Sequence, residues 1–244
     1  NVSMRRDRLR LDPERTRVVL VDTADRLLTG FAEEAGDYAA RTLRDRGVEL
    51  RLGTSVAEVT ADGVRLGDGS TIEAAAVVWA GGVTVDGTLV ATMPVDRGRG
   101  GRVEVADDLS LVGHPEVSVV GDAAAVPRGR DQGTAPQLAQ VAIQSGRHAA
   151  KQVLRRVEGV PTEAFTYKDK GIMATIGRRA AVAQLRRGPV IRGTLGWLAW
   201  LALHLLYLIG FRNRLVVMLN WTWRYFDWPA GPRLIVADVE VDTT

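Results

Sequence analysis

The stretch RVVLVD, residues 17–22, is the first clear structural signal in the chain, and it decides the fold class. Between Arg17 and Asp22 every residue is apolar and most are β-branched, which is typical of a strand buried on both faces of a parallel sheet. A helix is predicted over 33–46, with Gly47 as its C-terminal stop. A strand followed by a helix indicates an α/β fold.

The following segment continues this pattern. Residues 48–76 alternate short strands with Asp-Gly turns at 62–63 and 68–69, and VVWA at 77–80 is predicted to be a second buried strand. Strand, helix, strand, hairpin strands and closing strand are the order found in the second half of a dinucleotide-binding domain. The first strand of such a domain and its glycine-rich turn are absent from the sequence.

Two aspartates follow predicted strands, at the sheet edge where open α/β folds bind ligands. Asp22 can accept both ribose hydroxyls of an adenosine and repel a 2′-phosphate, which favours NADH over NADPH. Gly121 and Asp122 follow a predicted buried strand over 117–120, in VVGDAAAV, where a carboxylate suits a cofactor's sugar-alcohol chain. A turn-forming role is the alternative for each aspartate.

Glycines after VVWA offer a different kind of contact. Gly81 and Gly82 have no side chain, so the backbone there can approach a flat ring closely. A strand followed by an ordinary glycine turn is the alternative interpretation.

The segment PQLAQVAIQSGRHAA, residues 136–150, predicts a helix with Gln137, Gln140, Gln144 and His148 on one side. Taken alone, this is a solvated polar face. Pro136 suits the first helical turn, and the positive end of the helix dipole suits a flavin that gains negative charge on reduction. Alanines allow close approach, and the amides suit a flat molecule with carbonyls at its ends, such as a quinone.

The C-terminal part has a different composition. Five of the six tryptophans lie between 197 and 228, and nineteen residues between Arg192 and Arg212 carry no formal charge. Three interpretations are open: a helix lying in the membrane interface, a membrane span, or a soluble core or dimer contact. Arginines flank the stretch on both sides, at Arg178, Arg179, Arg186, Arg187, Arg192, Arg212, Arg214 and Arg224.

The composition excludes several classes of function. The 244-residue chain has no cysteine, so disulfide, thiolate-metal and thiol redox chemistry are excluded within it. Its three histidines do not have metal-ligand spacing, and we expect no metal site. A net charge of +3 without a basic, aromatic-interleaved stripe argues against nucleic acid. No signal peptide opens the sequence.

Taken together, the chain resembles the type II NADH dehydrogenases, the non-proton-pumping NADH:quinone oxidoreductases of respiratory membranes. The resemblance extends over essentially the whole chain. Its most specific parts are AQVAIQ at 139–144, which is similar to the AQxAxQ quinone-site motif of the family, and HLLYLIGFRNR at 204–214. The other matching segments are VVLVD, VVWAGGV, VVGDAAAV and YKDKGIMATIGRRAAVA.

The resemblance implies a Rossmann-like α/β flavoprotein with two dinucleotide-binding domains, and a role for each matching residue. Asp122 would bind the ribityl chain of FAD, and Ala139–Gln144 would lie against the isoalloxazine. Lys170 matches a lysine close to flavin and quinone, and Ala80–Gly82 would face the nicotinamide. The implied cofactor-binding residues are Asp22, Ala80, Gly81, Gly82, Gly121, Asp122, Ala139, Gln140, Val141, Ala142, Ile143, Gln144 and Lys170. The implied catalytic residues are Gln140, Gln144 and Lys170.

The implied reaction passes a hydride from NADH to flavin N5, after which the flavin reduces a membrane quinone. The C-terminal helices would hold the protein on the cytoplasmic face of a bacterial membrane without crossing it, and homodimers are common in the family. The corresponding division is 1–90 for half of the NADH domain, 91–160 for the returning FAD segment with the quinone-site helix, and 161–244 for the anchoring region.

One departure from the family pattern is important. Both glycine-rich nucleotide fingerprints are missing, so we expect a C-terminal fragment that by itself binds neither nucleotide well. Among the alternatives, sulfide:quinone oxidoreductase needs cysteines that are absent here. A soluble pyridine-nucleotide disulfide reductase would have no use for the tail. A non-catalytic membrane-surface module stays open.

Overall fold

The computed structural model describes most of the chain, in two compact units. One unit comprises Asn1–Val77 and Gly171–Thr244, and the other comprises Val78–Lys170. These units are defined by backbone contacts, whereas the divisions 1–90, 91–160 and 161–244 concern function and stay a prediction. The described residues are 16–85, 95–128, 133–186, 188–208 and 210–226.

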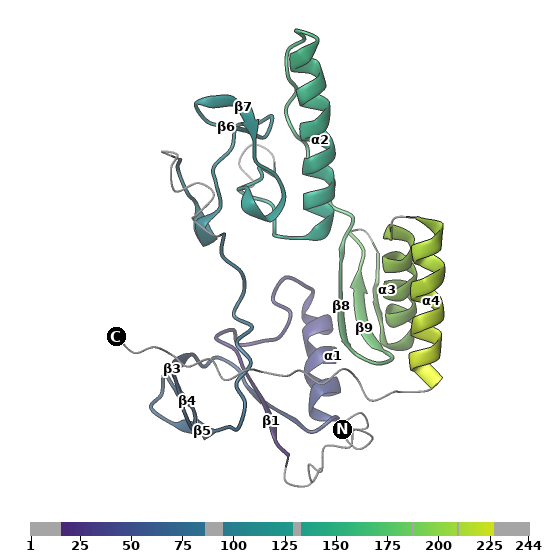
Figure 1. The fold of residues 1–244 in the computed structure, drawn as a ribbon. Helices are drawn as coiled ribbons and strands as arrows, with labels where there is room; N and C mark the ends of the chain where they lie inside the picture. The colour runs from purple at the N-terminus through teal and green to yellow at the C-terminus, as the bar shows by residue number, and fades with distance from the viewer. Residues whose placement is uncertain (1–15, 86–94, 129–132, 187, 209, 227–244) are drawn as a thin grey trace. The chain divides into compact units, whose positions relative to one another are not determined.

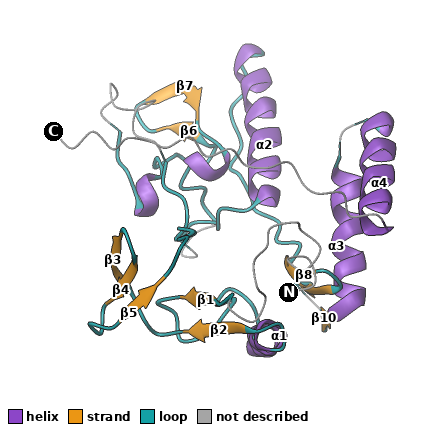
Figure 2. Ribbon diagram, turned by 60° about the horizontal axis from the view of Figure 1, so that its bottom comes forward, coloured by secondary structure: helices purple, strands orange, loops and turns teal. Residues whose placement is uncertain are grey.

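The first unit begins with a parallel β-α-β motif. Strand β1 (Val18–Val21) pairs in parallel with β2 (Val48–Arg51), and helix α1 (Glu33–Arg44) connects them (Figure 2). Acidic residues in the first turn of α1 and basic residues in its last turn complement the helix dipole. Gly47, at a φ of 81°, turns the chain two residues after the C-cap Asp45. The predicted helix and the α/β class are confirmed, although α1 ends two residues earlier than expected.

The prediction that the first strand is buried on both faces is wrong. Val18 is 42% exposed, and the rest of β1 is only partly buried. Among the described residues β1 pairs with β2 alone, so this sheet has two strands. A strand with a neighbour on one side leaves its other edge and part of its faces uncovered.

The predicted hairpin strands form a separate antiparallel sheet. It consists of β3 (Val56–Thr60), β4 (Gly63–Leu66) and β5 (Thr71–Glu73), in that order. The Asp-Gly turns at 62–63 and 68–69 connect these strands, as the sequence predicts.

The prediction of a buried strand over 77–80 is wrong. This segment has no strand structure, Val78 is 88% exposed and Trp79 is 69% exposed. Its apolar residues are suited to a sheet, but no strand in the described part of the chain pairs with it. Without a partner the backbone does not form a strand and its side chains stay in solvent.

The C-terminal residues of this unit build a three-stranded antiparallel sheet next to α1. Strands β8 (Ile172–Gly177) and β10 (Val190–Arg192) flank β9 (Ala180–Gln184), whose residues 180–183 are buried. The Gln184 Oε1 accepts the Ala32 N–H at 2.7 Å, which joins β9 to the start of α1. Strand β9 is the most buried of the three because it lies between the other two strands and under helix α3 (Gly193–Tyr207).

Helix α3 (Gly193–Tyr207) covers β9 closely (Figure 1), and it is followed by α4 (Phe211–Phe226). A Cβ placed on Gly196 would lie 2.9 Å from the Ala181 carbonyl oxygen and 3.0 Å from that of Ile191. Such distances are too short for a side chain, so glycine at this position sets the approach of helix and sheet.

Replacing Gly196 with valine is therefore expected to lower the free energy of unfolding by roughly 2 kcal/mol, because α3 must move away from β9. Urea unfolding of the chain measures this change. Gly146→Ala is the matched control, since nothing lies within 4 Å of a Cβ at this position. It is expected to stabilise helix α2 by about 0.5 kcal/mol. Equal effects of the two substitutions would contradict this account of the packing.

The second unit contains one long helix and little regular sheet. Helix α2 (Ala139–Val157) packs on a core formed by Leu109, Ala124, Val126, Ala135, Val141 and Phe165. Strands β6 (Ser110–Leu111) and β7 (His114–Ser118) form a short antiparallel pair. The predicted buried strand over 117–120 is thus wrong in its bounds and burial: β7 ends at Ser118, and the last two residues are only partly buried. Its single partner strand again leaves it incompletely covered.

Candidate functional site

The start of helix α2 is held against the Gly-Asp turn that the sequence singles out. Gly121 and Asp122 begin the short helix η3 (Gly121–Ala123). The Gly121 N–H donates to the Ser145 Oγ at 3.0 Å, and Ser145 is completely buried on α2. A Cβ on Gly121 would lie 3.2 Å from the Ala142 Cβ, and the φ of 66° also favours glycine. This turn and the first turns of α2 therefore lie in direct contact.

The helix begins later than the sequence predicts. It starts at Ala139 with Leu138 as its N-cap, so Pro136 precedes the first turn and Gln137 precedes the helix. The Gln137 Nε2 instead donates to the Asp122 carbonyl oxygen at 3.1 Å. Among the described residues, no side chain caps the N-terminal end of α2, and the Asp122 side chain is exposed nearby. The N-terminal end of α2 and an exposed carboxylate thus share one location.

The amide face of α2 has a partner that the sequence does not reveal. The Gln144 Oε1 accepts the Lys168 N–H and its Nε2 donates to the Lys168 carbonyl oxygen, both at 3.0 Å. One turn earlier the Gln140 Oε1 accepts the Lys170 N–H at 3.1 Å. The polar face is therefore not simply solvated, because it binds the backbone of the segment that returns along the helix.

Two further residues of α2 continue this pattern towards the end of the helix. The His148 Nε2 donates to the Glu163 carbonyl oxygen at 3.0 Å, and the buried Gln152 accepts the Glu163 N–H at 2.8 Å. Sequence reasoning missed Gln152, although its position continues the spacing of four residues from Gln140. We call the contacts of Gln140, Gln144, His148 and Gln152 with 163–170 the amide ladder.

Two of the apolar residues in the AQVAIQ motif, residues 139–144, are packed against the core or the Gly-Asp turn. Val141 is buried in the core, Ala142 contacts Gly121, and Ile143 is half-buried. Together with Ala139, Gln140, Gln144, Lys170 and the Gly-Asp turn they are brought together in the second unit.

A cleft of about 630 Å³ lies next to this region, in the same unit. Gly81 and Gly82 line it together with Trp79, and on the α2 side it is lined by Pro136 and Gln137. Arg102, which also lines it, donates to the Ala135 carbonyl oxygen at 2.9 Å. The two predicted glycines therefore face a cavity beside the segment that enters α2, while the exposed Ala80 is not among its lining residues.

Asp22 lies in the first unit and does form a turn. Its Oδ1 accepts the Ala24 N–H at 3.0 Å, the contact of an Asx-turn directly after β1. The side chain is exposed, and the second carboxylate oxygen of Asp22 could also accept a hydrogen bond from a ligand. The turn-forming interpretation is thus confirmed, and a role at the NADH ribose stays a prediction.

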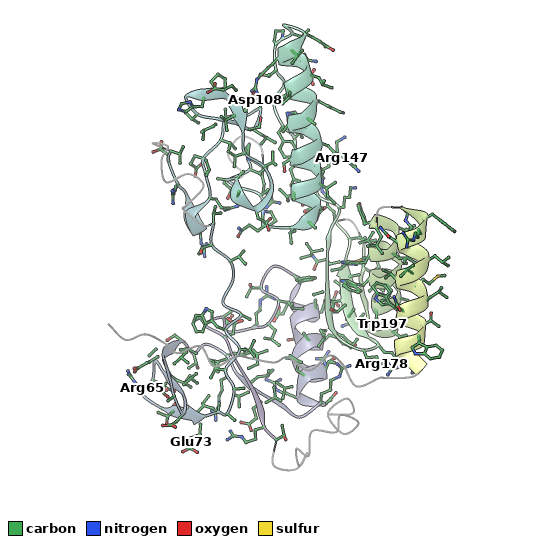
Figure 3. The ribbon with its side chains drawn as sticks, in the orientation of Figure 1. Arg65, Glu73, Asp108, Arg147, Arg178 and Trp197 are labelled. Atoms are coloured by element: carbon green, nitrogen blue, oxygen red, sulfur yellow. The ribbon has the colours of Figure 1, made fainter. Side chains whose placement is uncertain are left out.

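Two ionisable groups near the core of the second unit have shifted pKa values. Burial alone would raise the pKa of Asp108 (labelled in Figure 3), but hydrogen bonds from Ser110 and Thr162 and the nearby Arg156 charge outweigh burial. These contacts lower the Asp108 pKa to about 2. Burial, followed by the charge of Asp169, raises the pKa of the Tyr167 hydroxyl. The 2.8 Å ion pair of Asp108 and Arg156 anchors the second half of α2 to the turn before β6.

Asp108→Asn is expected to lower the free energy of unfolding at pH 7 by about 2 kcal/mol at most, because the lowered carboxylate pKa and the ion pair are both lost. The native pKa lies below the unfolded value, so this stabilisation is complete above about pH 4 and disappears as the pH falls through about 2. Urea titrations of both proteins at pH 7 and at the lowest pH where they fold measure the difference. A difference independent of pH would contradict the assignment.

A second surface lies on α3 and α4 of the first unit. Twelve large apolar side chains there are between 38% and 81% exposed, from Leu195 to Trp223. Residues 171–226 contain eight arginines and no Asp, Glu or Lys, although the whole chain has a net charge of only +3. Figure 3 labels Arg178 and Trp197 in this region. We call this the apolar-arginine surface. Its predicted members Arg187 and Trp228 and the Arg224 side chain lie outside the described parts.

The predicted nineteen-residue uncharged stretch is not one helix. Helix α3 ends at Tyr207 and α4 begins at Phe211. Among the described residues, no helix has both the length and the apolar character needed to cross a bilayer. The same residues hold no group of three or more His, Asp or Glu side chains placed to bind a metal ion.

This geometry agrees with the matches of the sequence to known families. Residues 11–146 match the pyridine nucleotide-disulphide oxidoreductase family, and residues 170–227 match the NDH2 C-terminal domain. The first match covers more than half of the chain, which therefore belongs to the pyridine nucleotide-disulphide oxidoreductase family. The fold prediction of a Rossmann-like flavoprotein is confirmed at this level.

Within this class, the relatives are more specific. The chain is 38% identical over 239 residues to the type II NADH:quinone oxidoreductase Ndh of Mycobacterium tuberculosis, covering 93% of this chain and 50% of that protein. It is also 38% identical to NdhA of the same organism, over 94% of this chain and 50% of the relative. These matches confirm the resemblance to type II NADH dehydrogenases. The chain spans about half the length of both relatives.

The fold is also similar to a solved structure, NDH2 from Plasmodium falciparum in complex with NADH. The TM-score is 0.75 and the sequence identity 14%, over 88% of this chain and 59% of that chain. At this identity the likeness concerns the fold alone.

Proposed function

We propose that this chain provides the quinone-side part of an FAD-dependent NADH:quinone oxidoreductase that does not pump protons. The observation that carries the proposal is the contact between the Gly121-Asp122 turn and the first turns of α2, beside the glycine-lined cleft. The identity to two NADH:quinone oxidoreductases supports the same activity.

The residues at this location fit an FAD. A Cβ on Gly121 would lie only 3.2 Å from the Ala142 Cβ, so the backbone of the turn lies close to α2, and the exposed Asp122 carboxylate can accept hydroxyl hydrogen bonds. The uncapped N-terminal end of α2 offers a positive dipole to a ring that gains negative charge. Asp122 would hold the ribityl chain, and the start of α2 would face the isoalloxazine. FAD, when bound, supplies the means to take a hydride from NADH and pass electrons to quinone.

The protein's own groups then have separate tasks. Gly81 and Gly82 would face the nicotinamide in the cleft. Nothing lies within 4 Å of a Cβ placed on Gly82, so its backbone is open to a ring, whereas the Trp79 ring lies 3.1 Å from a Cβ placed on Gly81. Gln140 and Lys170, joined through the Lys170 N–H, define the place where a quinone carbonyl is received. The Lys170 side chain is exposed and supplies positive charge next to that carbonyl.

The apolar-arginine surface is proposed to lie in the membrane interface. Exposed Trp, Leu and Phe side chains of α3 and α4 lose contact with water when they enter the headgroup boundary. The arginines of residues 171–226, a segment without Asp or Glu, are attracted to anionic lipid, although Arg192 already pairs with Glu34 of α1 at 3.7 Å. Such a protein rests on one side of the bilayer, and we place it on the cytoplasmic face of a bacterial membrane, as a homodimer. Sedimentation equilibrium in detergent tests the dimer.

The experiment that tests the proposed activity joins this chain to the part of M. tuberculosis Ndh that it does not cover. We call this protein the fusion enzyme. Purified fusion enzyme is expected to contain about one FAD per chain and to oxidise NADH with a water-soluble quinone. A folded, monodisperse fusion enzyme without flavin would overturn the proposal and would leave the non-catalytic membrane module as the better account.

A further inference from the structure

The amide ladder fixes the course of a backbone that has no sheet partner. Residues 161–170 contain no helix or strand, yet three of their N–H groups are accepted by side chains of α2, at Glu163, Lys168 and Lys170. The contacts run in antiparallel order, because Gln140 meets Lys170, Gln144 meets Lys168, and the last two residues of the ladder both meet Glu163. The ladder thus sets the register of this segment along α2.

Apolar contacts fix the same segment at its centre. Phe165 is 7% exposed, its N–H donates to the Asp107 carbonyl oxygen at 2.7 Å, and its ring meets the His148 ring edge-on at 5.3 Å. His148 therefore holds the segment in two ways, through Glu163 and through Phe165. A shift of the segment by one residue would remove Phe165 from the core and break the hydrogen bonds on both sides of it.

Both polar atoms of the Gln144 side chain take part in this ladder. Its carbonyl oxygen and its amide nitrogen bind the N–H and the C=O of the same residue, Lys168. The Gln144 amide nitrogen keeps a second hydrogen, so the contact with Lys168 fixes the orientation of the side chain and does not use all of its donors. The Lys170 backbone lies two residues further, at the end of the ladder, where it meets Gln140.

From these contacts we infer that Gln144 and His148 are positioning residues. They hold segment 163–168 in register and thereby place Lys170 beside Gln140. The inference rests on the proposed function for the role of Lys170. It assigns a task to His148, which is about two and a half turns of helix from the start of α2, and it adds a positioning task to the role that the family resemblance implies for Gln144.

The first arm of the test uses amide hydrogen exchange in the 244-residue chain and does not depend on any activity. Gln144→Met removes both ladder contacts at similar side-chain size, and His148→Phe keeps the ring contact but removes the N–H donor. Both are expected to speed exchange at residues 163–170 by about 10-fold, since stabilising hydrogen bonds are lost. Arg147→Gln, at an exposed position of the same helix, is the control and should leave exchange unchanged. Unchanged exchange in the Gln144→Met protein would overturn the inference.

The second arm measures quinone kinetics in the fusion enzyme. His148→Phe, far along α2 from Gln140, is expected to raise the KM for quinone about 5-fold while the rate of flavin bleaching by NADH stays unchanged. A purely structural role would lower the amount of folded enzyme without changing KM. If Gln144→Met raises KM but His148→Phe does not, Gln144 contacts quinone directly and the inference is wrong. A fusion enzyme without any activity contradicts the proposed function instead, and the exchange arm still decides the ladder.

Discussion

Replacing Leu206, Phe211, Leu219 and Trp223 with glutamine is expected to weaken the binding of this chain to lipid vesicles by roughly 100-fold or more. Each of these side chains is more than half exposed on α3 or α4, so each loses a large apolar area from contact with water on insertion. Because the positions are exposed, the substitutions leave the contact of α3 with β9 intact. Co-sedimentation with vesicles that contain phosphatidylglycerol measures the change.

The control for this prediction uses exposed apolar residues of the other unit. Leu154→Gln and Val157→Gln on α2 remove apolar surface outside the apolar-arginine surface and should leave vesicle binding unchanged. Wild-type binding is also expected to weaken by about 10-fold or more when phosphatidylglycerol is replaced by phosphatidylcholine, since several arginines lose their anionic partners. Equal loss of binding in the control would show that nonspecific hydrophobicity is responsible.

Asp122→Ala in the fusion enzyme is expected to lower the affinity for FAD by roughly 10- to 100-fold, because a hydrogen bond to a charged acceptor is lost. Because the Asp122 side chain is exposed, its removal should leave the fold unchanged. The hydrogen bond from Gln137 goes to the Asp122 backbone, which the substitution retains. The ratio of flavin to protein after dialysis, followed by titration with FAD, measures the effect.

Asp96→Ala is the matched control for Asp122→Ala. Asp96 is another exposed aspartate of the second unit, and its loss should leave the flavin content unchanged. A normal flavin content in the Asp122→Ala enzyme would show that the Asp122 carboxylate does not bind FAD. A loss of flavin in both variants would indicate a general effect of charge.

Local sequence signals predicted the fold well where the structure depends on neighbouring residues. The apolar run at 18–21, the helix that ends before Gly47 and the two Asp-Gly turns all depend on backbone preferences within a few residues. The same reasoning failed for VVWA at 77–80, because strand formation there requires a pairing partner that the described chain does not contain. Burial of β1 was overestimated for the same reason.

For the candidate site, too, the sequence predicts local features but not the contacts between distant residues. The spacing of Gln140, Gln144 and His148 predicted one polar helix face correctly, since helical periodicity is a local property. The partner of that face, segment 163–170, has no regular secondary structure and hence no pattern that a sequence reveals. Only the three-dimensional structure shows that the amides bind this backbone, and that Gln152 belongs to the same row.

In the proposed enzyme, electrons leave the flavin towards quinone at the start of α2. The most direct test is a stopped-flow comparison of the fusion enzyme with its Gln140→Ala variant, which follows flavin absorbance separately with NADH and with quinone. We predict that NADH bleaches the flavin absorbance of the variant at an unchanged rate. Quinone is expected to restore this absorbance at least about 10-fold more slowly than in the unsubstituted fusion enzyme. Unchanged rates in both directions, or equal losses in both, would contradict the claim.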